Sequence, residues 1–420
     1  MINKLNKEYR IALLMAISAM FTLAGYEFVR SASTVLFKAA YGAENLPLVM
    51  AAMPIVVLLG ISLYNKILSE LGPRRTLVVT SLGSGLIIFC CYILLINGSK
   101  VVTPFLYLTK ELYIVLLIEQ YWSYINSSLS PSSAKKLNGP VAGVAGIGSA
   151  LGGTLVGLSA GTLGTESMVL ISAFFLLPAV FVANYTYQHN GEPLPSEKEV
   201  NKKETSKKEP NKNESTMGWS WLRKNPTLGY LLVVVLLSQL LSAVLDLKFQ
   251  SLLSIEYAGR IDEETAFQGW FWGTLNTSVL ILQFVIVPML LSFVALRWIH
   301  VLMPVIHLFA IAIAVYEPNV FTVGLAFFLF KAFDYSLFRA AKEILYVPLS
   351  FDERYRTKQI IDVFGNRAGK GATSVIIVLL QRAGVMVNNY YLAAGFAAVI
   401  VWLIMIFPLT KHVSKNHLYD

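Results

Sequence analysis

The residues with the clearest chemical potential lie inside an apolar stretch near the C-terminus, IIDVFGNRAGKGATSVIIVLL, residues 360–380. Asp362, Asn366 and Lys370 recur there at steps of four, and Arg367 lies beside them. Residues four apart share one face of a helix, so the three form a polar stripe. An ionised side chain at mid-bilayer costs about 3 kcal/mol or more, so such residues usually face a cavity or one another. The stripe therefore predicts a wet cavity within a membrane.

In such a cavity these side chains suit the binding of an anion. Arg367 can donate two parallel hydrogen bonds to a phosphate or carboxylate, and Lys370 adds a compact positive charge. Asn366 adds a hydrogen bond, while Asp362 can orient the bases or take a proton. The alternative, which the sequence leaves open, is an ion-pair network between helices with no ligand.

The composition indicates a membrane protein made of helices. Hydrophobic residues make up 55% of the 420 residues and charged residues only 14%, whereas soluble domains carry about 25% charged residues. The mean hydropathy is +0.60. Apolar runs of about 20 residues, long enough for a helix to cross a bilayer, recur roughly twelve times. The expected spans are 11–36, 45–66, 76–97, 104–128, 138–160, 167–187, 227–251, 266–292, 297–315, 319–346, 359–381 and 389–410.

The net charge of +9 reflects membrane topology rather than nucleic-acid binding. Most Lys and Arg residues outside the spans lie at the termini or in even-numbered connections. The odd-numbered connections contain only Lys38, Lys100, Arg260 and Arg382. By the positive-inside rule both termini are expected in the cytoplasm, with the protein in a bacterial inner membrane. No nucleic-acid partner is expected, and the oligomeric state is open, a monomer being compatible with the sequence.

A polar segment divides the spans into two groups of six. Residues 190–225 are rich in Lys, Glu, Asn and Ser, and such a composition cannot form a core, so we expect a cytoplasmic linker. It separates an N-terminal six-helix half, 1–189, from a C-terminal one, 226–420. This all-α layout is typical of the major facilitator architecture, in which two halves rock about a central site.

Charged residues also occur in other spans. Arg30, Asp246 and Lys248 are expected to join the substrate site. Spacings of three or four, as in Lys331 with Asp334 and Arg339 with Glu343, place charges on one helix face where they can neutralise one another. The residues assigned to such ion pairs or to gating are Arg339, Glu343, Lys342, Lys331, Asp334, Lys110, Glu111 and Glu119.

Glycines in the fifth span predict close helix packing. Gly148, Gly152 and Gly157 are four or five residues apart, and small residues at such spacing let helix backbones approach closely. The surrounding GIGSALGG could be mistaken for a phosphate-binding loop, but no strand precedes it.

The segment AAKEILYVPLSFDERYRTKQIIDVFGNRAGKGATS, residues 340–374, resembles the ATP/ADP translocase (nucleotide transporter) family. The resemblance implies a major-facilitator-like fold and exchange of phosphorylated nucleotides. It also implies that Lys370 meets substrate phosphates and that Asp246 stands where the family has Glu. The chain departs from the family after ENLP, where LVM replaces a Lys-bearing sequence. A substrate with less negative charge would fit that loss.

These observations predict a secondary transporter that moves an anionic solute by alternating access, with nucleotides or nucleotide-like phosphate compounds exchanged as antiport. Two alternatives are a proton-coupled exporter of a carboxylate-rich metabolite such as a siderophore, and a non-transporting scaffold or sensor. We expect neither an enzyme nor a metal or cofactor site, because the five His residues are scattered and no nucleophile has a nearby base.

Overall fold

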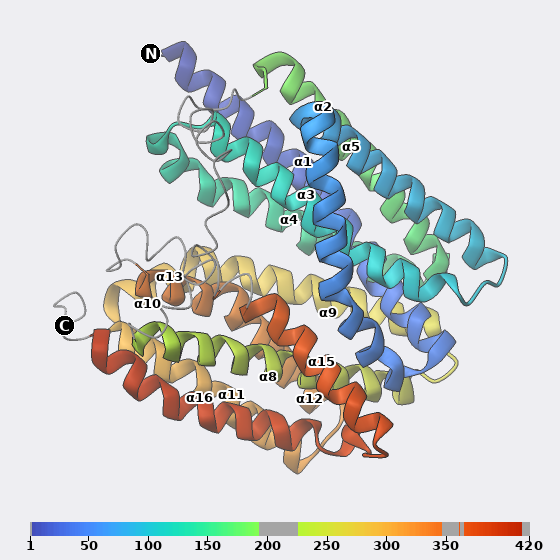
Figure 1. The fold of residues 1–420 in the computed structure, drawn as a ribbon, viewed down its shortest axis with the longest axis vertical. Coiled ribbons are helices and arrows are strands. Elements are labelled where there is room, and N and C mark those ends of the chain that lie inside the picture. The colour runs from blue at the N-terminus through green and yellow to red at the C-terminus, as the bar shows by residue number, and fades with distance from the viewer. Residues whose placement is uncertain (1, 193–225, 347–360, 362–364, 414–420) are drawn as a thin grey trace, which may run out of the picture. The chain divides into compact units, whose positions relative to one another are not determined.

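A computed structural model describes residues 2–192, 226–346, 361 and 365–413, with the side chains of 2–6, 366–368 and 411–413 excluded. Within these ranges every long regular element is a helix (Figure 1). The helices are α1 Ile2–Tyr41, α2 Leu46–Ile96, α3 Val102–Ser128, α4 Pro131–Leu163, α5 Thr165–Asn190, α8 Pro226–Glu256, α9 Ile261–Ile281, α10 Val287–Phe293, α11 Leu296–Tyr316, α12 Val320–Phe333, α13 Arg339–Leu345, α15 Asn366–Arg382 and α16 Tyr391–Val413. Within the described residues, each of the twelve expected spans lies on one of these helices or on a run of them, the second and third sharing α2.

Several helices depart from a simple one-span pattern. Helix α2 contains two expected spans, which are separated at Gly72, where φ is 75° and ψ is 170°. A positive φ is readily adopted only by glycine. The eighth span is α9, a π-helical segment η2 (Leu282–Ile286) and α10, and the tenth is α12, a π-helical segment η3 (Asp334–Phe338) and α13. The sequence pattern predicted neither π-helical segment.

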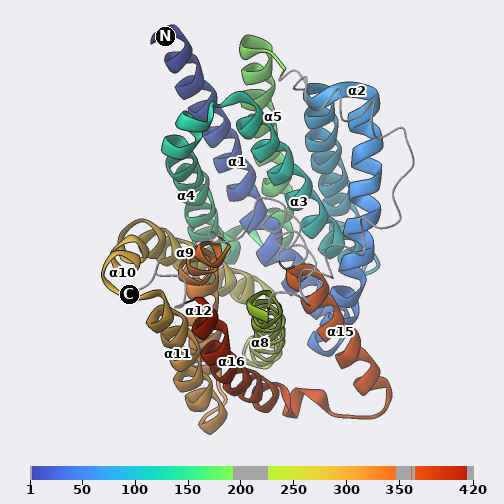
Figure 2. The same ribbon diagram turned by 60° about the vertical axis from the view of Figure 1, so that its left-hand side comes forward.

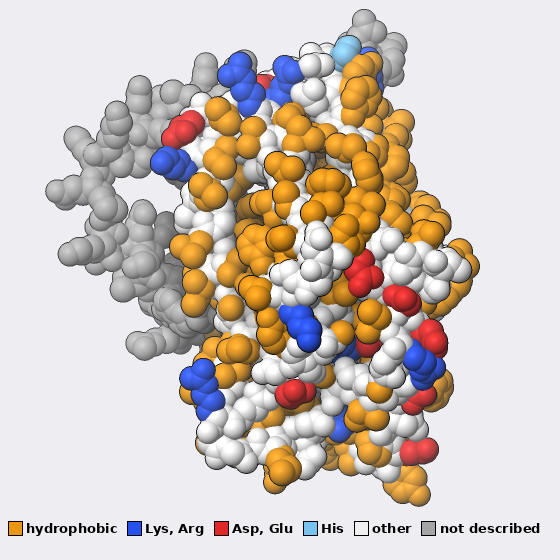
Figure 3. Space-filling view, turned by 90° about the vertical axis from the view of Figure 1, so that its right-hand side faces the viewer, with side chains coloured by type: hydrophobic (Ala, Val, Ile, Leu, Met, Phe, Trp, Pro, Cys, Tyr) orange, Lys and Arg blue, Asp and Glu red, His pale blue; other side chains and the backbone are white. Residues whose placement is uncertain are grey.

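The helices have the length and surface of membrane spans. By length and composition, nine helical stretches among the described residues can cross a membrane, one of them being the whole of Ala43–Ile96. Large apolar side chains such as Leu58, Leu59 and Phe181 are 66%, 66% and 71% exposed. Figure 3 shows hydrophobic side chains covering the upper part of one face, with charged side chains at its upper margin and below. Exposed apolar surface of this extent is what contact with lipid requires.

Contacts between Cα atoms divide the chain into two compact units, which are described separately. Unit 1 comprises Met1–Asn45, Ile55–Leu194 and Tyr257–Leu280, and unit 2 comprises Leu46–Pro54, Pro195–Glu256 and Ile281–Asp420. Unit 1 therefore includes most of α9, and unit 2 includes the start of α2. The expected linker lies, from residue 193 to 225, outside the described residues, so the domain boundaries stay predictions.

Helix α1 is the centre of unit 1 and α8 the centre of unit 2. Helix α1 lies along α3, α4 and α5 (Figures 1 and 2), and Met15, Val29 and Ala32 on it are fully buried. In unit 2, α8 lies along α16, α15 and α12. Helix α1 carries Glu27 and Arg30, and helix α8 carries Asp246; these charged residues belong to the candidate site described below.

Close packing through α4 is confirmed. A Cβ on Gly152 would lie 2.5 Å from the backbone oxygen of Ala24 on α1, and one on Gly153 would lie 2.5 Å from the backbone nitrogen of Gly273 on α9. Gly148 similarly meets the Met20 backbone, and Gly157 meets the Trp270 ring. Both sides of α4 thus depend on the absence of side chains, which lets α4 hold α1 and α9 within unit 1.

A methyl group at Gly152 should destabilise unit 1. In Gly152→Ala the new Cβ meets rigid backbone, so we expect a loss of about 1–3 kcal/mol, the usual cost of overpacking. Gly161→Ala on the same helix is the control, because nothing lies within 4 Å of its Cβ position; removing a helical glycine there should be neutral or stabilise by up to about 1 kcal/mol. Thermal unfolding in detergent measures both. Equal stability of the two variants would contradict this packing.

Candidate functional site

Two groups of side chains, one within each unit, are candidates for a substrate site. In unit 1, Glu27, Arg30, Trp272 and Asn276 form a set that we call the Glu27 cluster. In unit 2, Asp246 of α8 pairs with Lys370 of α15.

The Glu27 cluster joins one face of α1 to one face of α9. Glu27 and Arg30 are three residues apart on α1, and Trp272 and Asn276 are four apart on α9, so each pair projects from one side of its helix. Asn276 Nδ2 donates to Glu27 Oε1 at 2.9 Å. Arg30 Nη1 lies 3.5 Å from the same oxygen. Glu27 is 2% exposed and Trp272 5% exposed, whereas Arg30 and Asn276 are partly exposed.

The Arg30 guanidinium is positioned mainly by an aromatic ring. Its central carbon lies 3.3 Å from the centre of a Trp272 ring and 5.6 Å from that of Tyr26. A planar cation over an indole face is attracted by the negative charge density of the ring. The Arg30 side chain keeps 16% exposure. This arrangement places a positive charge against an aromatic ring within an apolar span.

Lys110 on α3 adds a second cation near Glu27. Its Nζ donates to Glu111 Oε1 at 3.0 Å and lies 4.0 Å from the centre of the Tyr107 ring. Lys110 is 3% exposed and attracts the Glu27 carboxylate electrostatically. Glu119, further along α3, is exposed. Of the expected pairs on this helix, the structure therefore brings Lys110 and Glu111 together.

A buried ion pair fixes the start of α9. Lys38 on α1 donates to Glu264, and the two residues are only 5% and 4% exposed. Nearby, Asp262 Oδ1 accepts hydrogen bonds from the backbone nitrogen and hydroxyl of Thr165 at 2.7 and 2.6 Å. These contacts tie α9 to α1 and α5, and so set the positions of Trp272 and Asn276, which lie about two to four helical turns further along.

The Asp246–Lys370 pair is more open to solvent. Lys370 Nζ lies 3.2 Å from Asp246 Oδ2, and the side chains are 37% and 20% exposed. Gly369 and Gly371 flank the lysine, where a Cβ on Gly369 would lie 3.0 Å from Gln239 of α8. Small residues thus bring α15 close enough to α8 for the ion pair. Partial exposure leaves the lysine accessible to water and to a water-soluble anion.

The structure describes only part of the other residues of the expected polar stripe. The backbones of Asn366 and Arg367 form the first turn of α15, but their side chains, and the whole of Asp362, lie outside the described residues. Their assignment to a substrate site stays a prediction. Lys248 does not join the Asp246–Lys370 pair. It lies two residues after Asp246 on α8 and projects from a different side of that helix, where its Nζ is 3.4 Å from the Asn388 backbone oxygen.

Lys331 contacts a hydroxyl group on a neighbouring helix. Its Nζ donates to the Ser242 hydroxyl on α8 at 2.8 Å, and its charge also attracts the Asp334 carboxylate electrostatically. The rings of Phe327, Phe330 and Tyr335 surround it at 5.2–5.8 Å. Asp334 begins the π-helical segment η3, and the assignment of Lys331 to an ion pair stays a prediction.

The other expected gating residues lie on α13. Arg339 and Glu343 are exposed there, whereas Lys342 is buried. The spacing of four places Arg339 and Glu343 on one face of the helix, and their gating role stays a prediction.

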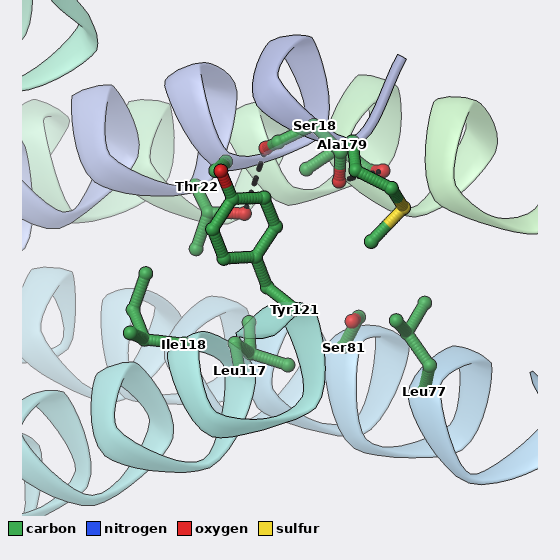
Figure 4. A pocket seen from close by; sticks show the side chains of 10 residues that line it. Ser18, Thr22, Leu77, Ser81, Leu117, Ile118, Tyr121 and Ala179 are labelled. Carbon is green, nitrogen blue, oxygen red and sulfur yellow. Dashed lines mark hydrogen bonds between the residues drawn. The ribbon is translucent and has the colours of Figure 1, made fainter. Parts of the chain in front are cut away.

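A pocket in unit 1 that is lined by both apolar and polar side chains is too small to be a substrate site. It lies between α1, α2, α3 and α5, and Figure 4 shows Ser18, Thr22, Ser81 and Tyr121 among its lining residues. Ser18 donates to the Ala179 backbone oxygen at 2.8 Å. The volume of about 20 Å³ corresponds to about one water molecule.

Sequence reasoning missed three members of the Glu27 cluster. Of this cluster, only Arg30 is assigned to the substrate site from the sequence. The spacing of Trp272 and Asn276 by four was a usable signal. Their contact with α1, however, depends on packing that no local pattern reveals.

Comparison with known proteins confirms the family resemblance over the C-terminal part. Residues 265–413, which include Lys370, match the family model of the TLC ATP/ADP transporters. A segment of 95 residues, 20% of this chain, is 32% identical to ADP,ATP carrier protein 1 of Rickettsia typhi, and it spans 19% of that protein's length.

Solved structures match over almost the whole chain. The nucleoside transporter NupG has a TM-score of 0.68 at 11% identity and covers 96% of this chain and 99% of its own. A D-xylose–proton symporter has a TM-score of 0.66 at 13% identity, covering 96% and 97%. The chain is a multi-pass integral membrane protein with a major-facilitator-like fold, and it resembles transporters rather than enzymes.

Breaking the buried ion pair at the start of α9 should be costly. In Lys38→Met the Glu264 carboxylate would lose its partner while still buried, a change that typically costs about 3–5 kcal/mol. Replacing both, as Lys38→Met with Glu264→Leu, should recover most of the stability. Arg260→Ala is the control, since Arg260, just before α9, and Glu263 in its first turn form an exposed pair worth about 0–1 kcal/mol. Thermal unfolding of the purified variants measures these effects, and equal losses for Lys38 and Arg260 would contradict the structural role.

Proposed function

We propose that the chain is a secondary transporter that exchanges an anionic solute across a bacterial inner membrane by alternating access, with both termini in the cytoplasm. The solute is a nucleotide or a nucleotide-like phosphate compound. The observation that carries this proposal is the partly exposed Lys370, which pairs with Asp246 of α8, a helix able to span a membrane, and which lies within the residues that match the TLC family model.

Lys370 is the proposed anion-binding group, and in the unliganded protein Asp246 pairs with it. Without a ligand, Asp246 neutralises the lysine and lowers the cost of keeping its charge inside a span. A phosphate carries more charge than a carboxylate and offers several acceptor oxygens, so it competes with Asp246 for the ammonium. The 37% exposure of Lys370 provides the access that this exchange of partners needs. The bound anion is thus selected by charge and acceptor number.

Arg30 is proposed as the contact from the N-terminal half. The Trp272 ring holds its guanidinium flat, which reduces the conformational entropy lost when it donates hydrogen bonds to a ligand. Arg367 and Asn366 are proposed to complete the C-terminal contacts. The guanidinium of Arg367 and the ammonium of Lys370 suit a substrate with more than one phosphate oxygen.

Loss of the Lys370 charge should abolish efficient exchange. Charge-assisted hydrogen bonds contribute about 1.5–3 kcal/mol, so Lys370→Ala should weaken nucleotide binding roughly 10- to 150-fold. The assay is uptake of labelled ATP by proteoliposomes loaded with ADP. Lys100→Ala is the control, because Lys100 is exposed in a connection. Absence of exchange with every nucleotide in the unaltered protein would refute the proposal, and proton-driven efflux of a carboxylate would favour the exporter alternative.

Removal of the competing carboxylate should have the opposite effect on affinity. In Asp246→Asn, Lys370 loses its ion pair with residue 246, so an anion no longer has to displace a carboxylate from the lysine. A partly exposed ion pair contributes about 1 kcal/mol, and the dissociation constant for nucleotide should therefore fall roughly fivefold. Calorimetric titration of the purified protein measures it. Weaker binding in Asp246→Asn would show that Asp246 contacts the substrate instead of competing with it.

A further inference from the structure

The Glu27 carboxylate has one oxygen bonded and one without a partner. Oε1 accepts the hydrogen bond from Asn276 and lies 3.5 Å from Arg30. Oε2 is buried and has no hydrogen-bond partner among the described residues. Glu264 and Asp262, the other acidic residues at the contact between α9 and its neighbours, both have bonded partners. Glu27 therefore stands out within unit 1 as an incompletely bonded buried acid.

Arg30 compensates the Glu27 charge only in part. An arginine that neutralises a carboxylate well forms two parallel hydrogen bonds to its two oxygens. Here the guanidinium lies 3.3 Å from the centre of a Trp272 ring, and one nitrogen reaches one oxygen at the limit of hydrogen bonding. An ionised carboxylate that is buried and incompletely bonded is costly. A proton on Oε2 removes that charge without breaking a hydrogen bond.

The groups that face Glu27 come from three helices. On α1 there is Arg30, and on α9 the neutral Asn276. On α3 there are Lys110, which also bonds Glu111, and the buried Tyr113. Helices α4 and α5 pack against α1 but have charged residues only near their ends. The charge state of Glu27 therefore depends on two cations, of which Arg30 is the one with partial solvent exposure.

We propose that Glu27 is the proton-binding site of the transport cycle, and that binding of an anion to Arg30 drives its protonation. An anion that engages the guanidinium withdraws positive charge from Glu27, which then takes a proton from water on Oε2. One O–H bond forms, and the charge added by the anion is offset in part. Proton and anion consequently favour each other's binding, as thermodynamic linkage requires. This inference rests on the proposed anion transport and adds its coupling ion.

Infrared spectroscopy tests the proton on Glu27 directly. Spectra of the purified protein recorded across a pH titration should contain the carbonyl stretch of a buried carboxylic acid, and Glu27→Gln should lack it. Glu263→Gln, at an exposed carboxylate, should retain the band. Glu27→Asp, which keeps a titrating group, should shift the band and serves where the glutamine variant does not fold. A spectrum unchanged by both Glu27 substitutions would overturn the inference.

A pH-indicator assay tests the linkage. Adding ATP to weakly buffered protein should cause uptake of up to one proton per bound nucleotide in the unaltered protein and in Glu263→Gln, and none in Glu27→Gln. Equal uptake in Glu27→Gln, with altered ATP affinity, would show that Oε2 serves the substrate instead and would overturn the inference. If calorimetry shows no ATP binding to the unaltered protein, the proposed function fails, while the infrared experiment still decides whether Glu27 binds a proton.

Discussion

The cost of an ionised side chain in an apolar environment governs the arrangement of this protein. Membrane-spanning helices can retain charges only where other groups compensate them, and the described charges meet that demand in different ways. Lys38 and Glu264 form a buried ion pair, Lys331 uses a hydroxyl, and Arg30 uses an indole ring. A charged side chain with a close, buried partner has a structural role, whereas one with a longer or more exposed contact can exchange one partner for another.

The contact between α1 and α9 contains one buried ion pair and, further along, one ion pair with a longer contact distance. At the start of α9 the Lys38–Glu264 pair is buried on both sides, which suits a fixed attachment to α1. Further along the contact between α1 and α9, Glu27 and Arg30 of α1 approach each other only to 3.5 Å. The rigid attachment keeps the weakly paired charges in register, so that a ligand or a proton can alter their balance without disturbing the packing of unit 1.

The sequence was sufficient for the helices but only partly for the site. Apolar length and glycine spacing predicted the spans and the packing of α4, because both depend on local pattern. The charge stripe led to Lys370, whose partner Asp246 had also been assigned. Glu27 was not assigned, since its environment arises from a contact between α1 and α9 that are far apart in sequence. Lys331 donates to Ser242 and also attracts the Asp334 carboxylate electrostatically, so its assignment to an ion pair stays a prediction.

The central claim is that an anion displaces Asp246 from Lys370. A structure of the protein bound to ATP, determined by electron cryomicroscopy in lipid, tests it most directly. We expect phosphate density within hydrogen-bond distance of Lys370 Nζ, with the Asp246 carboxylate moved away from the 3.2 Å contact. Nucleotide density elsewhere, with the Asp246–Lys370 pair intact, would contradict it.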